Sequence, residues 1–180
     1  MRRTMTFIPI IAAFSVFSGC SLMQTVMPAL LTDANVFSLL NTINQGEIDT
    51  GRLALQRASS EDVRSFASRL MTEHQRMMDD TGRLALQMKV QPKKPALASA
   101  LENEHQDVME GLRNTSGLDF DRAYITYQTK MHGQVADLVQ DTEQSVSSSH
   151  LQQHLQEIRL NLQSHFAAAR SLGRQVMARQ

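Results

Sequence analysis

Tryptophan is absent from this 180-residue chain, which also has only two tyrosines, eight glycines and four prolines. Sheet proteins depend on β-branched and aromatic residues and on frequent turns, so this scarcity favours an all-α fold. Hydrophobic residues still make up 42% of the chain, enough for one packed core. The 18 basic and 18 acidic residues balance. No basic stripe stands out among them, which argues against nucleic acid as a partner.

Cysteine occurs once, at position 20, so the chain cannot form an internal disulfide. Two arginines, a short apolar run over 5–17 and two small residues precede Cys20. That run is too short for a permanent membrane span and is typical of a signal peptide. Segment 17–20 (FSGC) resembles a bacterial lipobox, in which the cysteine is acylated. We therefore expect a lipoprotein signal peptide over 1–19, a lipidated tether over 20–31 and a helical bundle domain over 32–180.

This N-terminus predicts a location in the bacterial cell envelope, with Cys20 as the lipid attachment site. Two or more acyl chains give stable anchoring, so the membrane is the expected partner. Ser21 follows the cysteine, where lipoproteins kept at the inner membrane often carry Asp. The resemblance thus favours the outer membrane, facing the periplasm, and leaves a protein partner open.

Apolar periodicity predicts five helices, over about 33–57, 61–88, 96–113, 118–143 and 150–178. The last four of these helices are separated by polar or proline-containing segments, at 91–95 (QPKKP), 114–117 (NTSG) and 145–149 (SVSSS). The third helix is shorter than the others. We therefore expect an antiparallel four-helix bundle of two hairpins, with an additional short connecting helix between them.

Each long helix places one titratable residue at the centre of its apolar face, because residues on a helix advance by about 100°. These residues are Glu47, His74, His132 and His165. In each hairpin, the two titratable residues lie at similar numbers of residues from the connecting turn. Their heights along the bundle should therefore agree to within about one helical turn, roughly 5 Å. The spacing predicts that a glutamate and three imidazoles meet inside the bundle.

Two interpretations of this layer remain open. It could hold one transition-metal ion of the Zn, Fe or Cu kind. It could equally be a buried hydrogen-bonded network in which Glu47 balances a protonated histidine, and histidines on apolar faces are more often of this structural kind.

Three further patterns are weaker. Glu102 and His105 share a helix face at metal-ligand spacing, although a solvated face is the commoner reason for such a pair. His150 and His154 are four residues apart and could hold a surface ion. Four methionines around His74 would suit Cu(I), but methionine on an apolar face usually fills the core; they are Met71, Met77, Met78 and Met88.

Several segments together resemble a bacterial envelope family of unknown function with a ferritin-like helical bundle, known as outer-membrane proteins. They are 46–54 (GEIDTGRLA), 63–71 (VRSFASRLM), 73–74 (EH), 104–106 (EHQ), 120–124 (FDRAY), His132 and His165. The resemblance covers about 33–172 and implies a ferritin-like fold without implying a reaction. Di-iron members of that fold use Glu-x-x-His pairs. Here Met71 and Leu162 stand three residues before the two histidines, which argues against ferroxidase or oxygenase activity.

The sequence contains no Gly-rich phosphate loop and no Ser/His/Asp or Cys/His signature, so an enzyme is the less favoured class. The first functional prediction is a non-catalytic envelope lipoprotein with a buried Glu/His layer and a structural or stress-related role. The alternative is a binding module for a single transition-metal ion inside the bundle.

Overall fold

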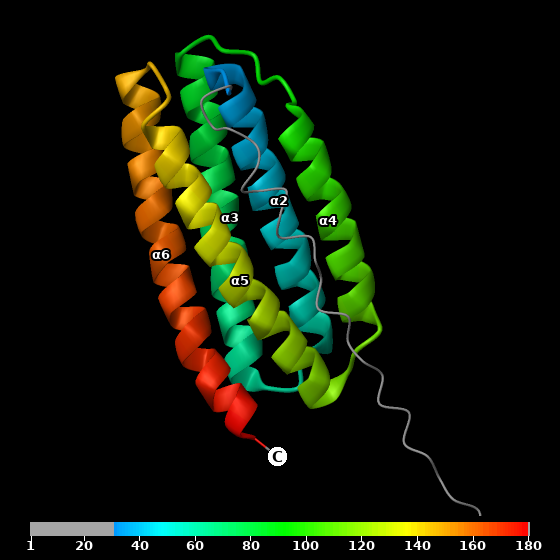
Figure 1. Ribbon diagram of the computed structural model, residues 1–180. Helices are drawn as coiled ribbons and strands as arrows, with labels where there is room; N and C mark the ends of the chain where they lie inside the picture. The colour runs from blue at the N-terminus through cyan, green and yellow to red at the C-terminus, as the bar shows by residue number, and fades with distance from the viewer. Residues whose placement is uncertain (1–30, 180) are drawn as a thin grey trace, which may run out of the picture.

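The computed structural model describes residues 31–179 of the chain (Figure 1). The predicted signal peptide, Cys20 and nearly all of the predicted tether lie outside these residues. Within the described range, none of the helices combines the length and the apolar character that a membrane span requires.

Five α-helices make up the described part of the chain. They are α2 (Asp33–Arg57), α3 (Glu61–Gln87), α4 (Ala96–Arg113), α5 (Gly117–Glu143) and α6 (Ser149–Ala178). The only strand-like pairing recorded over 31–179 is an isolated bridge between Ala58 and Gly117. The all-α prediction is confirmed, and the observed helix ends agree with the predicted ends to within one residue.

The helices form two antiparallel hairpins, α2–α3 and α5–α6, joined through α4 (Figure 1). Helix α4 carries the chain from the upper end of the bundle in that view back to the lower end and packs against α2. Helix α5 consequently runs parallel to α3, as a helical bundle with one long crossover connection requires. The predicted architecture of four long helices and a short connecting helix is confirmed.

The helix ends follow from local sequence. Thr32 and Asn35 form a reciprocal capping box at the start of α2, which satisfies two backbone N–H groups. Pro95 precedes the first residue of α4, in the extended conformation that ends one segment and begins another. Helix α5 begins at Gly117, whose φ of 59° lies in the left-handed region that glycine adopts without strain.

The two residues before α3 are held by a side chain from a distant helix. Ser60 makes no side-chain hydrogen bond to the first turn of α3. Instead Asp121 of α5, which is fully buried, accepts bonds from the Ser59 N–H (3.0 Å), the Ser59 hydroxyl (2.6 Å) and the Ser60 N–H (2.9 Å). We call these three residues the Asp121 corner. It ties the lower end of one hairpin to the other.

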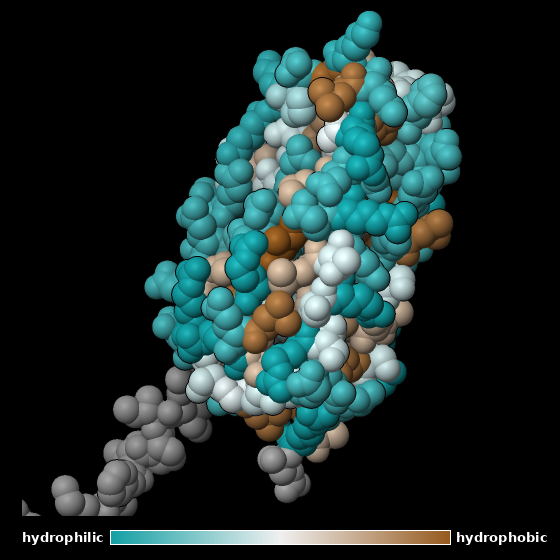
Figure 2. Space-filling view, turned by 180° about the vertical axis from the view of Figure 1, so that it is seen from behind, coloured by the Kyte–Doolittle hydropathy of each residue, from teal (hydrophilic) through white to brown (hydrophobic). Residues whose placement is uncertain are grey.

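The apolar core is divided into two clusters along the bundle axis. One cluster includes Phe37 and Leu40 of α2 and Leu155 of α6, and the other includes Leu70 of α3 and Phe120 of α5. Between them lies a layer of buried polar side chains, one or more from each long helix. The face of the bundle seen in Figure 2 is mostly hydrophilic with small separate apolar patches. The polar layer is therefore the feature of the interior that needs a chemical explanation.

Candidate metal centre

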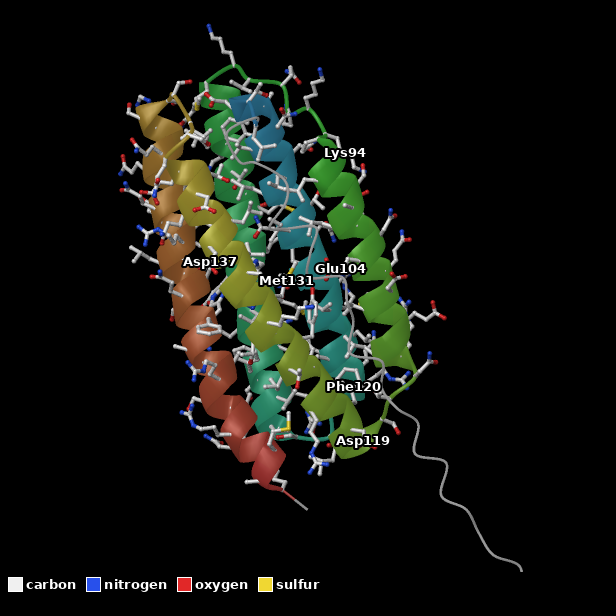
Figure 3. All side chains as sticks on the ribbon, in the orientation of Figure 1. Lys94, Glu104, Asp119, Phe120, Met131 and Asp137 are labelled. Atoms are coloured by element: carbon white, nitrogen blue, oxygen red, sulfur yellow. The ribbon has the colours of Figure 1, made fainter. Side chains whose placement is uncertain are left out.

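The polar layer lies about halfway along the bundle, near Met131, which precedes His132 in the chain (Figure 3). Every side chain of the layer is 4% exposed or less. Its members are Asn44 and Glu47 of α2, His74 of α3, Gln128 and His132 of α5, and His165 of α6.

The three histidines converge from three different helices. Their ring centroids are 5.4 Å apart for His74 and His132, 5.2 Å for His74 and His165, and 5.0 Å for His132 and His165. One ring nitrogen from each lies within 4.8 Å of the others. Three imidazoles thus share one small volume in the dry interior.

Hydrogen bonds on the outer side of two rings define their tautomers. His74 Nδ1 lies 2.9 Å from Asn44 Oδ1, and His132 Nδ1 lies 2.9 Å from the Gln128 carbonyl oxygen. Both oxygens are acceptors, so each Nδ1 carries the proton, and a neutral imidazole has only one. The Nε2 atoms of His74 and His132 are therefore unprotonated, and they face each other at 3.2 Å.

His165 is held by a carboxylate. Its Nε2 lies 2.5 Å from Glu73 Oε2, to which it donates. That leaves Nδ1 with the lone pair, and this atom is buried without a hydrogen-bond partner in the described structure. Every histidine of the cluster therefore donates one ring N–H to an oxygen and keeps one unprotonated nitrogen.

Burial favours the neutral form of the His74 and His165 rings. Loss of water lowers the pKa of His74 well below its usual value, and the neighbouring imidazoles of His132 and His165 lower it further. Burial and His132 also lower the pKa of His165 to about 4, although the Glu73 carboxylate acts in the opposite direction. Neutral imidazole is the form that coordinates a metal ion.

This donor arrangement fits a metal ion. Nitrogen ligands lie about 2.0–2.1 Å from Zn²⁺ in tetrahedral sites, which places two such nitrogens about 3.3 Å apart. The two Nε2 atoms are 3.2 Å apart. Metal-bound histidines almost always donate their second ring N–H to a carboxylate or a carbonyl, which is the pattern of all three rings here. His74, His132 and His165 would be the ligands.

Glu73 connects this centre to solvent. Its side chain is 44% exposed, whereas the His165 side chain to which it is bonded is 2% exposed. Glu73 also lines a shallow surface groove of about 630 Å³, together with Arg69 and Thr72 of α3. The Glu73 carboxylate therefore links the buried His165 ring to this groove.

Glu47 is buried but stands apart from the three histidines. It is 1% exposed, and no carboxylate belongs to the group of ligand atoms formed by the three rings. Its Oε1 accepts a long hydrogen bond of 3.3 Å from the Tyr127 hydroxyl, and its Oε2 has no partner within 31–179. Of the four residues that the sequence places at one height, the structure brings three together.

The secondary candidates lie elsewhere. Glu102 is half exposed and pairs with Lys94, whereas His105 packs beside Gly46 of α2. His150 is exposed, and His154 is hydrogen-bonded to Thr81 at 2.9 Å. None of these belongs to the three-histidine group.

Sequence reasoning missed the residues that support the ligands. Asn44 is polar within the apolar face of α2, between Ile43 and Ile48, and this interruption is the signal that could have identified it. Glu73 precedes His74 in the chain but reaches His165, 92 residues away. Nothing in the sequence indicates that contact.

The fold and the site together define a helical-bundle protein with a buried three-histidine centre. The chain belongs to the family described as a domain of unknown function, DUF4142, whose model matches residues 22–172. No curated protein matches the sequence.

A solved structure shares the fold. The chain is similar to CopM in the Cu(II)-bound form, with a TM-score of 0.64 and 13% sequence identity. The similarity covers 81% of this chain and 97% of CopM. At this identity the likeness concerns the bundle architecture alone.

Proposed function

We propose that this protein is a binding module for one transition-metal ion, held by His74, His132 and His165. The observation that carries the proposal is the pairing of the rings. Each outer N–H is already donated to an oxygen, so the unprotonated Nε2 atoms of His74 and His132 face each other without a proton between them. A cation placed among the three rings would relieve the repulsion between these lone pairs.

Copper is the ion that we favour. Three neutral imidazoles suit zinc, copper, iron and nickel, and copper binds most tightly to a given set of nitrogen ligands. Iron would be better served by carboxylate ligands, which the three-ring group lacks. The Cu(II)-bound state of CopM, which shares the bundle, is consistent with this choice.

The role we infer is binding rather than catalysis. All three rings are 2% exposed or less. Metal catalysis needs an open coordination position that a substrate can reach. A buried site of this kind is suited to holding an ion.

We further propose that the bundle is a lipoprotein anchored through Cys20 at the outer membrane, facing the periplasm. The support is the lipobox-like segment 17–20. A Cys20→Ser variant is expected to move from the membrane fraction to the soluble periplasmic fraction and to lose incorporation of labelled palmitate. Retention of both properties would refute the anchor.

Elemental analysis of the purified protein tests metal binding. After loading with Cu(II) or Zn(II) and desalting, we expect one ion per chain. His74→Ala combined with His132→Ala should abolish it. His154→Ala is the matched control, because His154 is a half-buried bundle histidine outside the centre. Absence of metal from the wild type, or an equal metal content in the double variant, would overturn the proposal.

The structural interpretation of the layer makes a different prediction. It is favoured by the 3.2 Å contact between His74 and His132, which a single shared proton would turn into a hydrogen bond. In that case the double variant would change only the free energy of unfolding, and neither protein would retain metal.

A further inference from the structure

The hydrogen-bond partners of the three rings differ in their access to solvent. Two of the rings are bonded to Asn44, which is 4% exposed, and to Gln128, which is fully buried. The His165 ring is bonded to Glu73, whose side chain is 44% exposed. Among the groups that these rings contact by hydrogen bonds in the described structure, Glu73 is therefore the one that reaches water.

The directions along the bundle axis are unsuited to the passage of an ion. The polar layer is bounded above and below by the two apolar clusters of the core. A cation that crossed either cluster would lose its hydration without gaining ligands, which is costly. The loss is smallest where a carboxylate extends from solvent to one of the rings, and that is the side of Glu73.

A surface groove opens on this side. Glu73 lines this groove of about 630 Å³, and so does Arg69, which lies one helical turn earlier on α3. Burial is the main cause of the lowered pKa of His165; the Glu73 carboxylate raises this pKa, and the charge of the exposed Arg69 lowers it. Charges in the groove therefore act on a ring of the centre.

The groove offers an arriving cation one attracting and one repelling charge. Its other two charged residues, Arg64 and Glu61, pair with each other at 2.7 Å. Arg69 takes part in no ion pair within 31–179, and its guanidinium lies 5.6 Å from the centroid of the Phe66 ring. The balance at the groove is therefore set by Glu73 and Arg69.

We propose that this groove is the entrance of the metal centre, where Glu73 captures the incoming Zn(II) or Cu(II) ion and passes it to the rings. The inference rests on the proposed function and adds the route by which the ion arrives and leaves. The bond to His165 uses only Oε2 of Glu73, so the second carboxylate oxygen can bind the ion first. Imidazole nitrogen suits both ions well, and the ion then moves on to the unprotonated ring nitrogens.

The rates of metal uptake and release test this route. Stopped-flow mixing of the metal-free protein with Zn(II) gives the association rate, and mixing of the loaded protein with excess chelator gives the dissociation rate. Thr72→Trp places a large side chain in the groove beside Glu73. We expect both rates to fall by the same factor and Kd to stay unchanged, because an obstruction raises the barrier without altering the free or the bound state. Gln106→Trp, in a separate groove of about 480 Å³, is the matched control and should change neither rate.

Charge variants give an independent measurement. Glu73→Gln should slow association about tenfold and Arg69→Gln should accelerate it about tenfold, because the two charges act on the approaching ion with opposite sign. Added salt should reduce both differences. Arg113→Gln removes an exposed arginine from the other groove and should leave association unchanged.

The route and the proposed function fail in different ways. A wild-type protein that binds neither Zn(II) nor Cu(II) refutes the proposed function. If the wild type binds Zn(II), unchanged rates in Thr72→Trp would show that the ion enters elsewhere. The same conclusion would follow if Glu73→Gln altered only the dissociation rate and Arg69→Gln altered neither, because Glu73 would then merely support His165.

Discussion

Two buried polar groups in the same bundle differ in how completely their hydrogen bonds are made. At the Asp121 corner, a fully buried carboxylate accepts three hydrogen bonds, and every donor comes from Ser59 or Ser60. At the three-histidine centre, the outer ring nitrogens have hydrogen-bond partners. The Nε2 atoms of His74 and His132, however, face each other without a proton between them. Burial is the same in both places. Hydrogen-bond satisfaction is what separates a structural polar group from one prepared for a ligand.

The physical reason lies in the direction of the donors. Ser59 and Ser60 present their backbone N–H groups just before α3, at the positive end of its helix dipole, which the Asp121 carboxylate matches. In the centre, Asn44 Oδ1 and the Gln128 carbonyl draw protons away from the space between the rings. The corner is complete within the chain, whereas the unprotonated nitrogens of the centre are where the proposed cation would bind.

The largest effect is expected at the corner. Asp121→Ala should lower the free energy of unfolding by about 3 kcal/mol, because it removes a fully buried acceptor from the two Ser59 donors and leaves the buried Ser60 N–H without a partner. Asp121→Asn, which retains one acceptor oxygen, should cost less. Urea unfolding measures both. Metal content should stay unchanged, and a loss of metal in Asp121→Ala without unfolding would show that the two regions are coupled.

Metal addition should stabilise only a protein with an intact centre. At a free ion concentration one hundred times Kd, the expected gain is about 2.7 kcal/mol. His74→Leu removes one ligand and fills the space with an apolar side chain, so its stability should not respond to metal. Thermal unfolding of both proteins with and without Cu(II) or Zn(II) measures this gain in stability. An equal gain in the variant would place the ion elsewhere.

Glu73 should matter to the centre because it fixes His165. Glu73→Ala removes the oxygen that holds Nε2–H, and loss of such a supporting carboxylate lowers metal affinity by about tenfold or more. Glu73→Gln keeps an acceptor oxygen and should lose less. Glu61→Gln, in the same groove but at the start of α3, is the control. Equal affinities in all three variants would contradict the supporting role.

The fold was readable from the sequence because the signals are local. Apolar periodicity and the breaks at 91–95, 114–117 and 145–149 predict the helices, and Thr32 and Pro95 mark where two of them begin. The connecting helix follows from its shorter length. These features depend on residues only a few positions apart.

Only part of the three-histidine centre could be predicted from the sequence. Helix geometry gives the direction and height of each side chain, and that was enough to place His74, His132 and His165 toward one another. It does not give the reach of a side chain, so it could not separate Glu47 from the rings. The Glu73–His165 bond and the Asp121 corner join residues 92 and 62 positions apart, and no local pattern predicts such contacts.

The most gradual expected effect is the pH dependence of the metal-free protein. Burial lowers the pKa of His165 in the folded chain to about 4, whereas an unfolded histidine titrates near 6.5. Above about pH 6.5, His165 is neutral in both the folded and the unfolded chain, so it adds no pH dependence to stability. Between about pH 6.5 and 4 the unfolded chain binds a proton that the folded chain does not, and stability falls as pH falls. The slope for one such proton is at most about 1.4 kcal/mol per pH unit. Urea unfolding in the presence of a chelator should therefore show a shallower loss in His165→Leu than in wild type, and parallel curves would mean that His165 is already charged in the folded bundle.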